Sequence, residues 1–195
     1  MTVELIRHGA TAYVGERRYQ GQTDVPLSPE GISALQADVR PLDRVYVSPM
    51  KRAQQTASVL FPAAVQIPVP GLEEMNFGDF EGRTPDEMET DEAYRSWVDS
   101  GCEDPCPTGE SKEEFSRRAC SAFAALLDDA LARGEEEVVI VAHGGVLMAV
   151  MDRFSLPRRP YFSWHCSCGG SYILDAEIWQ SEWCLRLISE KSYLK

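Results

Sequence analysis

The chain has 195 residues, of which 44% are hydrophobic, enough for the core of one domain. Its formal net charge of −12 gives a surface that repels nucleic acids and anionic membranes, so neither is expected as a partner. It contains no run of about 18 apolar residues, as a membrane-spanning helix needs, and it opens on a predicted strand without room for a signal peptide, so we expect a cytoplasmic protein.

Short apolar runs predict the strands of the fold. They lie at residues 3–6, 44–47, 138–142, 171–175 and 183–188. Helical patterns separate most of these runs, and such alternation predicts an α/β fold. We expect three layers, α/β/α, with a mainly parallel central sheet covered on both faces.

Several helix starts are marked by a hydroxyl residue followed by proline. This pair occurs at Ser28, Ser48 and Thr84, where each hydroxyl is predicted to cap a helix that begins with the proline. Ser111 and Glu114 have the spacing of a capping box, so Ser111 is predicted to cap a long helix over residues 112–133. The apolar stripe of that helix predicts packing along the sheet.

The chain changes character between residues 71 and 109, where acidic residues, prolines and glycines surround short helical pieces. We therefore expect one domain, residues 1–195, with a small helical insertion at about 79–110 over the sheet. Residues 100–108 contain Gly, Pro and Cys and are predicted to form a loop that can overhang a pocket.

The six cysteines could form a disulfide framework, a metal site or plain thiols, and the absence of an export signal argues against the disulfides. The ligand-like clusters are Cys102 with Cys106, and His165 with Cys166 and Cys168. Because neither has the paired C-x-x-C spacing of a structural zinc site, we expect reduced, partly buried thiols and no metal. Structural zinc is the alternative, and a metal assay on the purified protein distinguishes the two.

Two predicted strands end in a histidine. The first strand runs into Arg7 and His8, and the strand at 138–142 runs into His143 and Gly144. Ligands of open α/β sheets bind at the carboxyl ends of strands. If these strands are neighbours, both imidazoles face one cleft and the backbone amides of the following helix point into it, which predicts an anion site.

Four blocks of the sequence resemble the histidine phosphatase superfamily, which includes the cofactor-dependent phosphoglycerate mutases. They are L-I-R-H-G-A-T from residue 5, S-P-M-K-R-A-Q-Q-T-A from 48, L-E-E-M-N-F-G from 72 and V-A-H-G-G from 141. The resemblance spans nearly the whole chain. It implies a phosphoglycerate mutase-like fold and phosphoryl transfer through a phosphohistidine, with no cofactor.

The resemblance implies catalytic roles for five residues. His8 is the nucleophile, while Arg7 and Arg52 clamp the phosphoryl oxygens and disfavour a protonated imidazole. His143 donates to the oxygens of the transferring group. Glu74 protonates the leaving group and later takes a proton from the attacking water.

Glu74 has a rival in the adjacent Glu73. Glu74 lies two residues after Leu72 and two before Asn76, as in the family pattern, whereas Glu73 is expected to point the other way. The alternative is that both are solvated loop acids.

The resemblance also implies substrate contacts. They lie at Arg7, Thr11, Gln20, Gly21, Arg52 and Gly144. Arg17 and Arg18 either meet a second anionic group of the substrate or form a solvated face.

Two departures from the mutase pattern favour hydrolysis. The asparagine that mutases carry six residues after the nucleophile is Val14 here, and the insertion is short and acidic. The sequence thus predicts a phosphomonoesterase that acts on a small phosphorylated metabolite. A phosphoglycerate mutase and a catalytically silent binding protein are the alternatives.

Within the superfamily, residues 74–81 and 94–97 are similar to the α-ribazole phosphatases of cobalamin biosynthesis. α-Ribazole 5'-phosphate is therefore one candidate substrate, and the protein is expected as a monomer or a homodimer. Four aromatic side chains either stack on a base-like leaving group or belong to the core. They are Trp97, Tyr161, Phe162 and Trp164.

Overall fold

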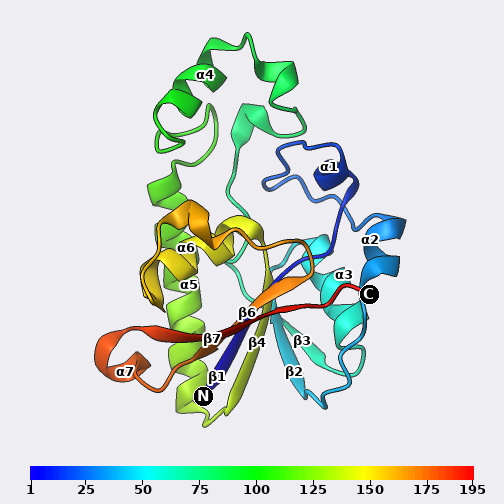
Figure 1. Cartoon of the computed structure of the whole chain (residues 1–195), viewed down its shortest axis with the longest axis vertical. Coiled ribbons are helices and arrows are strands. Elements are labelled where there is room, and N and C mark those ends of the chain that lie inside the picture. The colour runs from blue at the N-terminus through cyan, green and yellow to red at the C-terminus, as the bar shows by residue number, and fades with distance from the viewer.

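The computed structural model describes residues 1–195 and contains a seven-stranded sheet in the order β3-β2-β4-β1-β6-β7-β5. The strands are β1 (Thr2–Arg7), β2 (Arg44–Val47), β3 (Val65–Pro68), β4 (Glu137–Ala142), β5 (Ser155–Leu156), β6 (Gly170–Asp175) and β7 (Leu185–Ser192). β3, β2, β4 and β1 run parallel, whereas β6 is antiparallel to β1 and β7 (Figure 1). The predicted mainly parallel sheet is confirmed.

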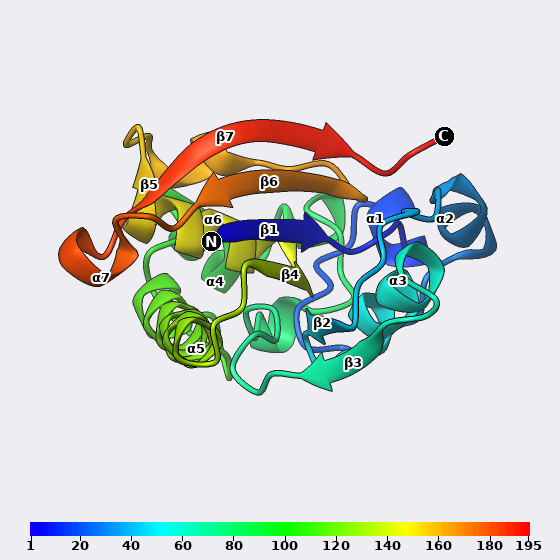
Figure 2. The ribbon, with the colours of Figure 1, turned by 90° about the horizontal axis from the view of Figure 1, so that it is seen from below.

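Helices cover both faces of the sheet. They are α1 (Ala12–Gly15), α2 (Pro29–Ala34), α3 (Lys51–Leu60), α4 (Glu92–Asp99), α5 (Lys112–Ala132), α6 (Gly144–Phe154) and α7 (Trp179–Glu182). Short 3-10 turns occur at Gly78–Phe80, Asp86–Met88 and Tyr161–Trp164. Figure 2 shows α5 and α3 on opposite sides of the sheet, as three α/β/α layers require. No helix is both long and apolar enough to cross a membrane.

The central strands send alternate side chains into two cores. Leu5 of β1 and Ile140 of β4 lie in the larger core with residues of α5 and α6. Ile6 and Val141, one position further along each strand, lie in the smaller core with residues of α3. Because successive strand residues face opposite sides, a strand covered on both faces must be apolar throughout, as β1 and β4 nearly are.

The predicted hydroxyl caps are confirmed at Ser28 and Ser111 and wrong at Ser48. Ser28 caps α2, and Ser111 forms a complete capping box at the start of α5. α3 begins at Lys51, without a side-chain cap. The Ser48 hydroxyl instead lies 2.7 Å from His143 Nε2, a contact that the local sequence does not reveal.

The predicted last strand, residues 183–188, starts two residues too early. Trp183 has a left-handed backbone, with φ of 52°, at the end of the unpredicted helix α7, so β7 begins only at Leu185. The short strands β3 and β5 were also unpredicted. β3 is an edge strand whose residues Val65 and Pro68 are exposed, and it therefore lacks an apolar pattern.

Residues 79–110, the predicted helical insertion, contain α4 and lie beyond the carboxyl ends of β1 and β4 (Figure 1). Thr84 Oγ1 accepts a hydrogen bond from Glu87 N at 3.1 Å, but the segment after it is a 3-10 turn whose N-cap is Pro85, so the predicted α-helix cap at Thr84 is wrong. Phe80 and Trp97 are buried in the same core as α5 and α6. The segment is thus packed against the edge of the sheet where the two histidines lie.

All six cysteines are free thiols. Burial raises the pKa of the Cys106 and Cys120 thiols to about 12, which makes them poor nucleophiles and poor metal ligands near neutral pH. No group of three or more His, Cys, Asp or Glu side chains is arranged to hold a metal ion.

Glu4, on the strand that leads to His8, is a buried carboxylate. It accepts hydrogen bonds from Arg40 Nη2 at 2.6 Å, Ser171 Oγ at 2.7 Å and Tyr193 OH at 2.9 Å. In Glu4→Ala the buried hydroxyls of Ser171 and Tyr193 and the half-buried Arg40 lose this acceptor, so we expect the free energy of unfolding in urea to fall by about 3 kcal/mol. Glu137→Ala removes a more exposed partner of Arg40 and should cost less than about 1 kcal/mol. Equal losses in the two variants would contradict this prediction.

Candidate active site

β1 and β4 bring His8 and His143 to the same edge of the sheet. The two strands pair in parallel with Arg7 opposite Ala142, and each histidine is the next residue. The ring centroids lie 5.2 Å apart, and both side chains are buried. The two strand ends are therefore neighbours, as the anion-site prediction requires.

Two adjoining cavities lie at this edge. The smaller, which we call the cationic cavity, has a volume of about 180 Å³, and its polar lining includes Arg7, His8, Arg18, Gln20, Arg52 and Glu74. The larger, the apolar cavity, has a volume of about 300 Å³, and its lining includes Phe77, Trp97, Phe115, Met148, Tyr161 and Phe162. Arg7, Tyr19, Glu74 and Phe77 line both. A charged space thus adjoins a largely hydrophobic one.

His8 is a neutral imidazole with one free nitrogen. Its Nδ1 lies 2.6 Å from the carbonyl oxygen of Gly9, and since a carbonyl only accepts, Nδ1 carries the proton. Burial, together with the charges of Arg52 and Arg7, lowers the pKa of His8 to about 3. Nε2 therefore keeps its lone pair at neutral pH, as a nucleophile must.

We expect His8 to stay neutral from pH 8 down to about pH 4, because a lowered pKa shifts protonation to more acidic solution. The NMR signals of its ring should not move over that range. The chain has three histidines, so His8→Gln assigns the signal by its disappearance. A His8 signal that titrates near the ordinary histidine pKa of about 6.5 would contradict the prediction.

Arg52 of α3 is fully buried beside the two histidines. Its Nε donates to His143 Nδ1 at 3.1 Å, and its terminal nitrogens donate to the carbonyl oxygens of Thr23 at 3.1 Å and Gly21 at 2.7 Å. Burial lowers the pKa of Arg52 to about 10, so the side chain remains a cation at neutral pH. Gly21, predicted as a substrate contact, lines the cationic cavity and also orients this guanidinium.

His143 is fully buried, beside Arg52, and lines neither cavity. Its Nδ1 accepts from Arg52, so Nε2 carries the ring proton and donates to Ser48 Oγ at 2.7 Å. Burial and the charge of Arg52 hold the pKa of His143 well below its usual value, so the ring has no second N–H. In this arrangement His143 orients Arg52, and its donation to a phosphoryl oxygen stays a prediction.

Gln20 and Thr11 form a second contact to Arg52. With its amide oxygen toward Arg52, Gln20 accepts from Nε at 3.2 Å and Nη1 at 3.1 Å, and it donates to Thr11 Oγ1 at 2.9 Å. The Thr11 hydroxyl also caps α1 by accepting from Val14 N. Thr11 lines neither cavity and contacts Gln20, which lines the cationic one; direct contact of the Thr11 hydroxyl with substrate stays a prediction.

Arg7 lies between the two cavities and lines both. Its Nη1 donates to the Cys166 carbonyl oxygen at 2.5 Å, whereas its buried Nε has no partner. A Cβ on Gly144 would lie 3.3 Å from this Nε, so glycine there leaves room for the guanidinium. A half-buried cation with a buried, unpaired N–H is suited to bind an anion.

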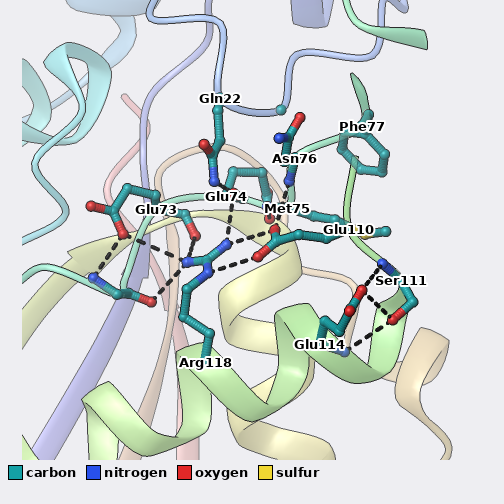
Figure 3. A network of polar contacts seen from close by, with 12 residues as sticks. Gln22, Glu73, Glu74, Met75, Asn76, Phe77, Glu110, Ser111, Glu114 and Arg118 are labelled. Atoms are coloured by element: carbon teal, nitrogen blue, oxygen red, sulfur yellow. Dashed lines mark hydrogen bonds and ion pairs between the residues drawn. The ribbon is translucent and has the colours of Figure 1, made fainter. Parts of the chain in front are cut away.

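Glu74 is held at the start of α6, where both cavities meet. Its carboxylate accepts from Gly145 N and from Met75 N, each at 3.0 Å. A Cβ on Gly145 would lie 2.2 Å from Glu74 Oε1, so this approach requires glycine. The Glu73 carboxylate lines neither cavity and is ion-paired with Arg118 at 3.5 Å (Figure 3).

Arg118 of α5 fixes the backbone around Glu74, a role that the sequence did not indicate. Its guanidinium donates to the carbonyl oxygens of Gly71, Glu73 and Glu74. It also makes two hydrogen bonds, of 2.9 and 2.8 Å, to the carboxylate of Glu110, which in turn accepts from Asn76 N (Figure 3). The one available signal was a pair of adjacent cations, Arg117 and Arg118, beside the apolar stripe of α5.

The two adjacent arginines do not form a free anion-binding pair. Arg18 lines the cationic cavity but is ion-paired with Glu16 at 2.6 Å and Glu87 at 2.8 Å. Arg17 is exposed and lines neither cavity. The arrangement favours the solvated, ion-paired interpretation.

Three of the four aromatic candidates for stacking line the apolar cavity, namely Trp97, Tyr161 and Phe162. Trp164 is fully buried, and the Arg159 guanidinium lies 4.5 Å from its ring centroid, so it belongs to the core. The remaining aromatic side chains of the cavity were not predicted, because they come together only through the fold. They are Tyr19, Phe77 and Phe115.

Solved structures show the same architecture. The α-ribazole phosphatase from Shigella flexneri has a TM-score of 0.82 and 28% sequence identity, with 100% of this chain and 98% of that chain covered. A phosphoglycerate mutase from Thermus thermophilus has a TM-score of 0.71 and 26% identity, with 98% of this chain and 99% of that chain covered.

Sequence relatives carry phosphatase and mutase names. A protein of Escherichia fergusonii named "Probable phosphoglycerate mutase" is 29% identical over 206 aligned positions, which cover 100% of this chain and 95% of that protein. A Hydrogenobacter thermophilus protein provisionally named phosphoserine phosphatase 2 is 32% identical over 156 positions, 75% of either protein. The model of the histidine phosphatase superfamily (branch 1) matches residues 3–189. The chain therefore belongs to the histidine phosphatase superfamily and has its phosphoglycerate mutase-like α/β fold.

Proposed function

We propose that the chain hydrolyses phosphomonoesters through a phosphohistidine on His8, with no cofactor. The observation that carries this proposal is the neutral His8, whose Nε2 lone pair is free in a cavity lined by Arg7 and Arg52. Fixed cations beside a neutral imidazole bind a phosphoryl group and at the same time keep the nucleophile unprotonated.

The first half of the reaction transfers the phosphoryl group to the protein. His8 Nε2 attacks phosphorus, the ester P–O bond breaks, and Glu74 gives its proton to the leaving oxygen. Nδ1 keeps its proton on the Gly9 carbonyl throughout. Arg7 and Arg52 offset the negative charge of the phosphoryl oxygens.

The second half releases the phosphoryl group to water. Water attacks phosphorus, Glu74 takes a proton from it, and the P–N bond to His8 breaks. Inorganic phosphate leaves, and both side chains return to their starting forms. Glu74 lines both cavities and is thus placed to act on the leaving group and on the water that replaces it.

The apolar cavity supports a leaving group with aromatic or other apolar surface. Its volume of about 300 Å³ is at the lower end for small-molecule sites, and its walls carry Trp97, Tyr161 and Phe162. The α-ribazole phosphatase of Shigella flexneri, similar over the whole chain, makes α-ribazole 5'-phosphate the first candidate substrate.

A panel of esters tests the proposal. α-Ribazole 5'-phosphate, phenyl phosphate, phosphoserine and 3-phosphoglycerate are each assayed for phosphate release in the presence of a chelator. We expect phosphate release, fastest with the two aromatic-type esters. If no ester is hydrolysed and no label appears on His8, the chain is a binding protein and the proposal fails.

A phosphoglycerate mutase is the second candidate, supported by the name of the Escherichia fergusonii relative, which aligns with the whole chain. A mutase should interconvert 2- and 3-phosphoglycerate and depend on a bisphosphorylated primer. Interconversion that outpaces phosphate release would favour this candidate over hydrolysis.

A further inference from the structure

Lys112 is the one lysine in the wall of the apolar cavity. It is the first residue of α5, where the helix dipole disfavours a cation. Its Nζ lies 4.8 Å from the ring centroid of Tyr161 and 5.4 Å from that of Phe162, and both rings also line the cavity. Because the Lys112 side chain is only 20% exposed, its ammonium group lies in the cavity wall rather than in the solvent.

Glu103 neutralises this charge from the neighbouring loop. Its carboxylate is ion-paired with Lys112 Nζ, and the preceding residue, Cys102, lines the cavity. The loop is fixed where Ser100 Oγ accepts from the backbone N of Glu103 and Asp104, each at 3.2 Å. The Glu103 side chain is 58% exposed, so it carries its negative charge at the solvent side of the pair.

We infer that the Glu103–Lys112 pair selects neutral leaving groups over those that carry a carboxylate. A carboxylate in the apolar cavity must displace Glu103 from Lys112 and then lie close to a like charge. A neutral aromatic group meets the rings without displacing any charge. The inference rests on the proposed function and names the substrate class of the same site.

Two esters of the same shape test the inference by differing in one charge. They are 4-carbamoylphenyl phosphate, which has a neutral leaving group, and 4-carboxyphenyl phosphate, which has an anionic one. Dissociation constants are measured by calorimetry in the His8→Ala background, so that neither ester is consumed. We expect the carbamoyl ester to bind about three- to tenfold more tightly, the range of one partly exposed charge pair.

Glu103→Gln should remove this preference by freeing Lys112 for the carboxylate. The affinity for the carboxy ester should rise about three- to tenfold, while that for the carbamoyl ester stays within about twofold. Lys112→Met retains much of the aliphatic stem but lacks the ammonium, so adding it to Glu103→Gln should restore the preference for the neutral ester.

Glu113→Gln is the matched control, because it removes the same charge from a neighbouring side chain that is 86% exposed. It should leave the preference unchanged. The inference is overturned if Glu103→Gln does not alter the ratio of the affinities for the two esters, or if Glu113→Gln alters this ratio equally. It is also overturned if the rise in affinity for the carboxy ester persists when Lys112→Met is added to Glu103→Gln. Phosphate release from phenyl phosphate by the unaltered chain tests the proposed function separately, so the two failures are distinguishable.

Discussion

We expect the replacement of His8 with alanine to lower kcat for phosphomonoester hydrolysis by at least about 10⁴-fold, the loss that removal of a covalent nucleophile should cause. No other group at the cationic cavity can replace it. His143 has one ring nitrogen bound to Arg52 and the other to Ser48, and it lines neither cavity. Steady-state phosphate release measures the loss, and circular dichroism shows whether the variant is folded.

Trapping of the intermediate separates a nucleophile from a binding residue. Rapid quenching with a ³²P-labelled ester should give an acid-labile, base-stable label on His8 in the unaltered chain and none in His8→Ala. His165→Ala, which changes an exposed histidine, should still become labelled. A label on His143, or a label that persists in His8→Ala, would show that His8 is not the nucleophile.

The parts of the fold that follow from local pattern were predictable. β2 occupies the residues predicted for it, and β1 and β4 extend their predicted runs by one residue at one or both ends. Apart from Glu4, the buried side chains of these strands are apolar toward both cores, and this pattern can be read from the sequence without knowledge of the fold. β3 gave no such signal because an exposed edge strand needs no continuous apolar run.

The strand-end pattern also predicted that His8 and His143 would meet, but not what each ring would bind. The orientation of His143 depends on Ser48 and Arg52, which come from another part of the chain. Arg118 likewise acts on carbonyl oxygens more than 40 positions away, which no local motif marks. Sequence thus indicated which residues gather, whereas the direction of their hydrogen bonds required the folded chain.

Glu74→Gln should slow leaving-group release from esters of poor leaving groups, such as alkyl phosphates, by about 10²- to 10⁴-fold. An alkoxide needs a proton as the P–O bond breaks, whereas 4-nitrophenolate leaves without one. Release of 4-nitrophenol in a single turnover should therefore stay within about threefold of the unaltered rate. Glutamine can still accept the Gly145 N–H, so the position of the side chain is kept.

Loss of Glu74 should also alter the second half of the reaction. With 4-nitrophenyl phosphate the variant should release one equivalent of nitrophenol quickly and then turn over slowly. The second step is slow because no carboxylate takes the proton from the attacking water, so phosphorylated His8 should accumulate. Glu73→Gln makes the same chemical change one residue away, where the carboxylate contacts Gly71 and Arg118 outside the cavities. It should show neither effect. If Glu73→Gln produced the dependence on leaving group and Glu74→Gln did not, the acid would be Glu73.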